Sequence, residues 1–143
     1  MATFKNYLHG LFVLGALCAL PAFCADVVVV VSAKSPVSTL TADQVSQLFL
    51  GKLANFPGGG VAIPIDQAES SAIRDEFYTK VTSKTAAQIK AYWSKLIFTG
   101  KGQPPKEVKS SADVKRLVSA NPNVIGYIDR AAVDATVKIV WSH

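Results

Sequence analysis

Cysteine and histidine are almost missing from this sequence. Both cysteines, Cys18 and Cys24, and one of the two histidines, His9, lie within the first 24 residues, and His143 is the last residue. Beyond residue 24 the chain therefore has no disulfide, and it lacks the parts of a Cys/His zinc site or of a Ser-His or Cys-His nucleophile pair. Carboxylate or lysine chemistry stays formally open, but no paired-acid motif stands out. We therefore expect no enzyme, no metal and no cofactor.

Long apolar runs are also missing, apart from one near the N-terminus. Leu11–Phe23 is apolar, follows a segment with one charge, Lys5, and is followed by small residues. This run is shorter than the roughly 20 residues of a membrane-spanning helix, and its pattern is typical of a secretory signal peptide. We predict a signal peptide over residues 1–25 and an exported, periplasmic domain over residues 26–143; cleavage after Cys24 is the open alternative. No lipobox precedes either cysteine, so the chain is not expected to be anchored to a membrane.

Acidic residues are outnumbered by basic ones, 10 to 15, for a formal net charge of +5. The basic residues gather after residue 100, at Lys101, Lys106, Lys109, Lys115 and Arg116. Such a run is usually a solvated face, although it can attract polyanions by long-range charge. Aromatic residues do not alternate with these lysines, and export argues against nucleic acid, so we expect no nucleic acid as a partner.

The remaining chain alternates short apolar runs with helical patterns. Five consecutive valines, Val27–Val31, indicate a strand covered on both faces, as in a parallel sheet. Thr41 and Gln44 form a capping box that starts a helix, and Trp93 belongs to the apolar face of a later one. The other predicted elements are helices near residues 73–81, 85–98 and 110–120 and strands at 61–65, 124–128 and 137–141. This alternation predicts a single α/β domain with a mainly parallel sheet flanked by helices.

Two loops follow predicted strands and are candidates for binding. Ser32–Pro36 would leave the carboxyl end of the valine strand, where open α/β sheets usually bind ligands, although a plain polar connection fits equally well. Glu69, Ser70 and Ser71 lie between the strand at 61–65 and the helix that carries Ile73. Unpaired N–H groups and the helix macrodipole favour an oxyanion at such a helix start, and Arg74 adds donors. An ordinary N-cap is the alternative interpretation.

Three motifs in this order resemble a known family. They are Leu-Thr-x-x-Gln-Val-x-x-Leu-Phe-x-Gly51-Lys52, then Ile-Pro-Ile-Asp-x-x-x-Ser-Ser71-x-x-Arg74-x-x-Phe77, then Ile125-Gly126-Tyr127. Together they resemble the phosphate-type substrate-binding proteins of ABC transporters, which have a periplasmic-binding-protein-like fold. The similarity covers most of the chain after residue 25. The family usually has two lobes that close on the ligand, and this chain has residues for about one.

The resemblance implies a periplasmic solute-binding protein for phosphate or a similar oxyanion. Its site residues would be Gln67, Glu69, Ser70, Ser71, Ala72, Ile73 and Arg74, with Glu69 accepting the proton of hydrogen phosphate. Two positions depart from the family pattern, because Ile73 replaces a threonine and Gln67 replaces a charge-pairing arginine. An ABC permease and a second copy of the chain are the candidate partners. The alternative is a non-transport module that keeps the fold and binds a protein or envelope component.

Overall fold

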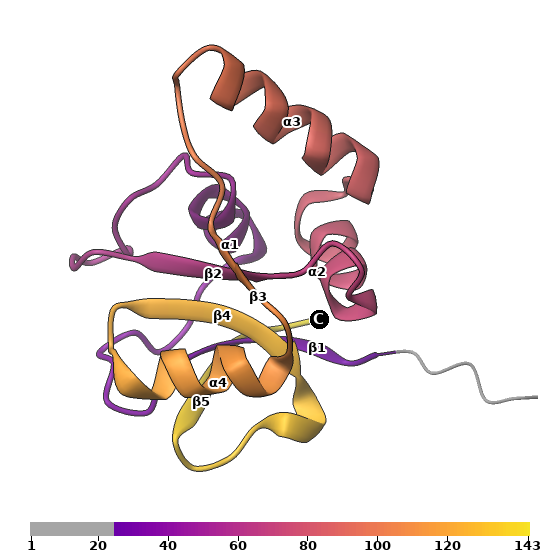
Figure 1. The fold of residues 1–143 in the computed structure, drawn as a ribbon. Helices are drawn as coiled ribbons and strands as arrows, with labels where there is room; N and C mark the ends of the chain where they lie inside the picture. The colour runs from indigo at the N-terminus through magenta and orange to yellow at the C-terminus, as the bar shows by residue number, and fades with distance from the viewer. Residues whose placement is uncertain (1–24) are drawn as a thin grey trace, which may run out of the picture.

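A computed structural model describes residues 25–143. The predicted signal peptide lies outside these residues, apart from Ala25. The described chain contains the elements β1 (Val27–Ser32), α1 (Ala42–Phe49), β2 (Ile63–Gln67), α2 (Ala72–Thr82), α3 (Ala86–Phe98), β3 (Lys106–Val108), α4 (Ser111–Ala120), β4 (Val124–Asp129), the short 3-10 helix η1 (Arg130–Ala132) and β5 (Val137–Ser142). The predicted α/β class is confirmed (Figure 1).

The five strands form one sheet in the order β3-β2-β4-β1-β5. β2 pairs parallel with β3 and with β4, whereas β1 pairs antiparallel with both β4 and β5. The sheet is therefore mixed. The five valines of β1 are fully buried, as their composition predicts. The prediction that β1 pairs with parallel neighbours was wrong. Burial on both faces requires helices or loops over each face, and it does not depend on the direction of the neighbouring strands.

The direction of β1 also corrects the first candidate loop. Val27 pairs with Asp129 and Val31 with Ile125, so the carboxyl end of β1 lies beside the amino end of β4. Ser32–Pro36 consequently leaves the sheet at the edge opposite the carboxyl ends of β2 and β4. Ser32 and Ser35 are buried, and their hydroxyls accept hydrogen bonds from backbone N–H groups two residues further on. This loop is a local connection and does not join the predicted anion site.

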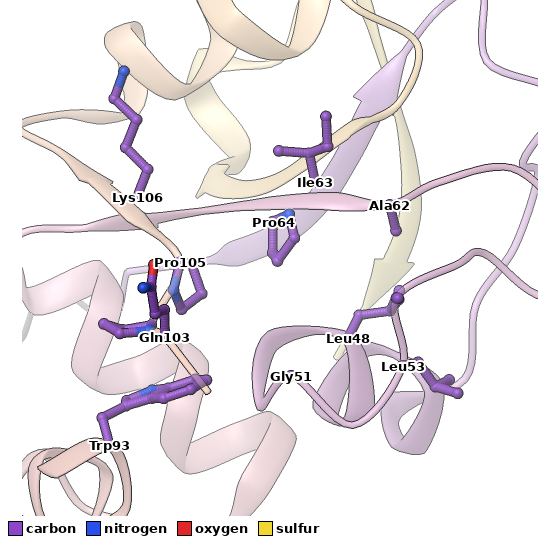
Figure 2. A pocket seen from close by; sticks show the side chains of 12 residues that line it. Leu48, Gly51, Leu53, Ala62, Ile63, Pro64, Trp93, Gln103, Pro105 and Lys106 are labelled. Atoms are coloured by element: carbon purple, nitrogen blue, oxygen red, sulfur yellow. The ribbon is translucent and has the colours of Figure 1, made fainter. Parts of the chain in front are cut away.

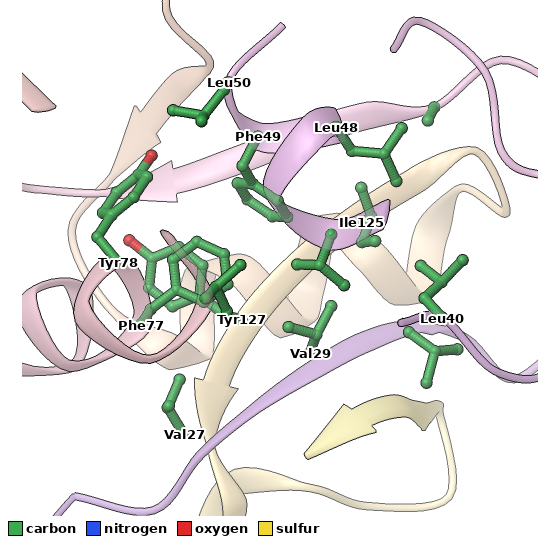
Figure 3. Packing of buried hydrophobic residues seen from close by; sticks show 14 of the residues in the cluster. Val27, Val29, Leu40, Leu48, Phe49, Leu50, Phe77, Tyr78, Ile125 and Tyr127 are labelled. Carbon is green, nitrogen blue, oxygen red and sulfur yellow. The ribbon is translucent and has the colours of Figure 1, made fainter. Parts of the chain in front are cut away.

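Alternate valines of β1 pack into two apolar cores. Val27, Val29 and Val31 belong to a core that includes the apolar faces of α1, α2 and α3, whereas Val28 and Val30 belong to one that includes α4. Figure 1 shows α4 on one side of the sheet and the other three helices on the opposite side, with α3 farthest from the sheet. Phe77 stacks on Tyr127 at 4.0 Å between ring centroids, and Phe49 meets Phe77 edge-on at 4.7 Å (Figure 3).

Local sequence signals explain where the helices begin. Thr41 and Gln44 form the predicted capping box of α1, and Thr85 with Gln88 forms a second one at the start of α3. Trp93 is buried in the core, as expected. Strand β2 begins two residues later than predicted, and β3 was missed because Lys106–Val108 carries no apolar alternation. Its strand conformation comes from pairing with Ile65–Gln67 of β2.

Candidate anion site

Two helices begin at the same edge of the sheet. α2 follows the carboxyl end of β2 after a four-residue connection, and α4 follows the carboxyl end of β3. Because β2, β3 and β4 are mutually parallel, these ends lie together. α2 covers one face of the sheet and α4 the other. The partial positive charges of two helix N-termini therefore face the same edge.

Gln67, the last residue of β2, connects the two helix starts. Its side chain is buried, and its Nε2 donates to the carbonyl of Tyr127 at 3.0 Å and to the hydroxyl of Ser111 at 3.3 Å. Its Oε1 accepts a hydrogen bond of 3.1 Å from the hydroxyl of Ser71. The hydroxyl of Ser111 also accepts from the backbone N–H of Asp129, at the end of β4. Hydrogen bonds thus hold the starts of α2 and α4 against the ends of β2 and β4.

The N-terminus of α2 remains open. Ser71 is its N-cap residue, but the Ser71 hydroxyl is bound to Gln67 and does not cap the helix. Among residues 25–143, the backbone N–H groups of Ala72 and Ile73 donate no hydrogen bond. The two starts differ one residue further on, where the N–H of Arg74 donates to the carbonyl of Ser71, whereas the N–H of Asp113 in α4 donates to the hydroxyl of Ser110. Ser70 and Ala72 are exposed, so an anion can reach the free N–H groups of α2 from solvent.

Arg74 belongs to a buried cluster around Asp66, to which the backbone N–H of Gln67 also donates, at 2.8 Å from Oδ1 of Asp66. The Nε of Arg74 lies 3.3 Å from Oδ1 of Asp66, and its guanidinium lies over the ring of Tyr78. Asp66 also accepts from the hydroxyl of Tyr78 at 2.7 Å and from the hydroxyl of Tyr127. Since side chains alternate along a strand, Asp66 and Gln67 point to opposite faces of β2. The structure therefore joins Ser71 to Gln67 and joins Arg74 to Asp66.

The ionisation of this cluster follows from its burial. Burial alone would lower the pKa of Arg74, but the Asp66 carboxylate beside it raises that pKa above its ordinary value. Burial, reinforced by the negative charge of Asp66, raises the pKa of Tyr78 and of Tyr127. Arg74 thus stays protonated beside Asp66, and both tyrosines act as hydroxyl donors to the Asp66 side chain.

Glu69 faces a different neighbour. Its carboxylate lies 3.8 Å from the Nζ of Lys90 on α3, and both side chains are largely exposed. Together with Arg74, Trp93 and Glu107 they line a cavity of about 190 Å³ between α2 and α3. The predicted site residues therefore lie in two places. Gln67, Ser71 and the N–H groups of α2 are at the sheet edge, whereas Glu69 and Arg74 line this cavity.

A second cavity carries no cluster of donors. It has a volume of about 360 Å³ and lies beside the amino end of β2, between Pro64, Pro105 and the ring of Trp93 (Figure 2). Its lining is apolar apart from Gln103 and Lys106. Among residues 25–143, no group of three or more His, Cys, Asp or Glu side chains is placed to hold a metal ion.

Sequence reasoning did not assign Ser111 or Asp66 to these clusters. Ser111 was recognised only as part of a helix start, and nothing in the local sequence shows that this start meets β2. Asp66 could have been singled out from the sequence, because it is an acid next to the apolar residues Ile63–Ile65 of the same strand. Buried acids are almost always paired, which points to a partner such as Arg74.

No family model matches the chain, and no curated protein sequence matches it. Solved structures do match it. One from Clostridium perfringens, described as a phosphate ABC transporter substrate-binding protein with bound phosphate, has a TM-score of 0.66 and 26% identity over 80% of this chain and 44% of that chain. The chain has the fold of one lobe of a phosphate-type substrate-binding protein.

Two further structures show the same relationship. An ABC-type phosphate transport receptor from Vibrio cholerae has a TM-score of 0.64 and 21% identity, over 80% of this chain and 45% of that chain. PstS from Borrelia burgdorferi has a TM-score of 0.57 and 19% identity, over 80% of this chain and 46% of that chain. The chain spans less than half the length of each of these proteins. The family resemblance in the sequence is thus confirmed at the level of the fold.

None of the helices in residues 25–143 combines the length and the apolar character that crossing a membrane requires.

Proposed function

We propose that this lobe binds phosphate or a similar oxyanion as a periplasmic substrate-binding component of ABC-type phosphate transport, after export and removal of residues 1–25, and that it is not an enzyme. One observation carries the proposal: the open N-terminus of α2 lies beside Gln67 and Ser71. The fold is shared with a Clostridium perfringens protein whose structure holds phosphate, which supports the same ligand class here.

In the proposed complex the anion lies on the backbone N–H groups of Ala72 and Ile73. The hydroxyl of Ser71 turns from Gln67 toward the anion, and the helix macrodipole supplies partial positive charge. Ser70 is exposed at the mouth of the site. To accept the proton of hydrogen phosphate, which a fully ionised oxyanion such as sulfate cannot donate, the side chain of Glu69 turns from Lys90 toward the anion. Arg74 does not touch the anion in this arrangement and instead fixes α2 against Asp66.

The described residues supply donors from one side of the anion only. A second side would come from a second copy of the chain or from a permease. Self-association predicts that phosphate increases the dimer population, which sedimentation velocity measures with and without phosphate. A permease alone as the second side predicts no change in sedimentation.

Isothermal titration calorimetry of the exported chain with phosphate and with sulfate tests the proposal. We expect saturable heat with phosphate and weaker heat with sulfate. A matched control is Thr85→Ala, which removes the capping side chain of α3 and none of the proposed contacts with the anion. This variant should lose about 1 kcal/mol of stability and keep the phosphate affinity. Absence of phosphate binding at millimolar concentration would contradict the proposal and favour a module that binds a protein or envelope component.

A further inference from the structure

The end of α3 exposes two large apolar side chains. Phe98, its last residue, is 92% exposed, and Ile97 before it is 55% exposed. Helix α3 is held to the core by Ile89 and Trp93. Phe98 points away from both, whereas Ile97 follows Trp93 along the same face of the helix and lines the same cavity. Single exposed apolar residues are common on protein surfaces. An adjacent pair at a helix end, one of them almost fully exposed, needs a further explanation.

The charged residues of the surrounding sequence are all lysines, while Glu69 and Glu107 from outside it line the same cavity as Ile97. Residues 77–106 contain no aspartate or glutamate, and they contain the lysines Lys80, Lys84, Lys90, Lys95, Lys101 and Lys106. Lys95 and Lys101 flank Phe98, are exposed and form no ion pair among residues 25–143. Lys95 alone is explained by the partial negative charge at the helix C-terminus. That explanation does not account for Phe98 or for Lys101 in the turn that follows.

The fold places this end of α3 at the outside of the molecule. Figure 1 shows α3 ending at the point farthest from the sheet, from which the chain returns toward β3. The last turn of α3 passes directly into the turn at Thr99–Lys101, whose backbone bonds back to Leu96 and Ile97. We refer to Lys95, Ile97, Phe98 and Lys101 as the α3 tip.

We propose that the α3 tip docks on the surface of an anionic lipid bilayer. Phe98 and Ile97 enter the boundary between headgroups and acyl chains, while Lys95 and Lys101 remain with the lipid phosphates. The charge of this region is complementary to an anionic surface, and each lysine near that surface adds to the attraction. A lipid boundary accepts two protruding apolar side chains directly, whereas a protein partner would need a matching pocket. This contact is reversible surface binding and is distinct from a membrane anchor.

Co-sedimentation of the exported chain with phosphatidylglycerol vesicles and with phosphatidylcholine vesicles tests the proposal. We expect binding to the anionic vesicles only, weaker in 0.5 M salt because salt screens the lysines. Phe98→Ser should lower the partition coefficient roughly tenfold or more, since it removes the aromatic ring that enters the bilayer. The double variant Lys95→Glu/Lys101→Glu should abolish binding. Leu53→Ser, at an exposed apolar residue outside the α3 tip, is the matched control and should bind like the parent.

Three results would overturn the proposal. The first is an absence of binding to anionic vesicles at low salt. The second is equal binding by Phe98→Ser and the parent, which would leave only diffuse attraction by the lysines. The third is equal loss of binding in Leu53→Ser and Phe98→Ser. Retention of the parent and of Phe98→Ser on polyglutamate beads, without vesicle binding, would indicate an acidic protein partner in place of the bilayer.

Discussion

The guanidinium of Arg74 lies 3.3 Å from the carboxylate of Asp66, and their side chains are only 6% and 2% exposed. The two residues join the first turn of α2 to the strand that leads into it. Tyr78 and Tyr127 complete the cluster by donating to the same carboxylate. From the sequence, Arg74 could be either a ligand for an anion or a buried partner of Asp66. The arrangement in the structure favours the second role.

The variant Arg74→Ala distinguishes these roles. Removal of one member of a buried ion pair leaves the other uncompensated and typically costs about 3–5 kcal/mol. We expect a loss of stability of this size in urea unfolding, with a phosphate affinity in the folded fraction close to that of the parent. Arg74→Lys, which keeps the charge, should recover part of the stability. If Arg74→Ala unfolds like the parent but binds phosphate ten- to a hundredfold more weakly, Arg74 is a ligand, as the sequence alone predicts.

Ser71 is the side chain on which the proposed anion site depends most. A hydrogen bond to a charged group contributes about 1.5–3 kcal/mol, so Ser71→Ala should weaken phosphate binding about ten- to a hundredfold. The Ser71 hydroxyl does not cap α2, but its loss leaves the buried Oε1 of Gln67 without its donor and should also cost about 1–3 kcal/mol of stability. Calorimetry and thermal unfolding of the same samples measure both effects. A lower melting temperature with unchanged affinity would mean that Ser71 serves only the fold.

Local signals allowed several features to be predicted from the sequence. The capping box of Thr41 and Gln44 involves residues three apart, and it is present as expected. Burial of Val27–Val31 follows from their composition. Trp93 was placed correctly in the core because its helix has a regular apolar period. In each case the physical cause lies within one turn of helix or one strand.

Features that depend on distant pairing could not be predicted. The direction of β1 is set by its neighbours β4 and β5, which follow it by about a hundred residues. β3 is a strand because it pairs with β2, not because of its own side chains. The meeting of Gln67 with Ser111 likewise requires the order of the strands in the sheet. A single sequence contains no local record of these contacts.

The raised pKa values of Tyr78 and Tyr127 predict a loss of stability at alkaline pH. An unfolded tyrosine ionises near about pH 10, whereas in the folded chain burial and Asp66 keep both hydroxyls protonated to higher pH. Above about pH 10 the unfolded state therefore binds fewer protons, and stability falls by about 1.4 kcal/mol per pH unit for each tyrosine. Below pH 10 the full stabilisation is present.

Urea unfolding at several pH values between 8 and 11 measures this dependence. Tyr78→Phe should be less stable than the parent at pH 8, because Asp66 loses a donor, but its stability should fall less steeply above about pH 10. Lysines titrate equally in both proteins and cancel in the difference between the two slopes. Equal slopes for Tyr78→Phe and the parent would show that Tyr78 ionises as freely in the folded chain as in the unfolded one.

The close approach of β4 and α4 at Gly126 gives a further prediction. A Cβ at Gly126 would overlap Cγ1 of Val114 and crowd Cγ2 of Val118, both of which are buried in the core beneath α4. Gly126→Ala should therefore cost about 1–3 kcal/mol, the usual range for an overpacked core. Because Gly126 is one residue from Tyr127, the shift of α4 should also loosen the contact between Ser111 and Gln67 and weaken phosphate binding.

The double variant Gly126→Ala/Val114→Ala tests the cause, because the smaller residue on α4 frees the space that the new methyl group needs. It should be more stable than the sum of the two single variants implies, by about 0.5–3 kcal/mol. Gly102→Ala is the matched control, since a Cβ there meets only side-chain atoms at ordinary contact distances. This control should unfold within about 0.5 kcal/mol of the parent. Additive losses in the double variant would show that the cost of Gly126→Ala arises in the strand itself and not from contact with α4.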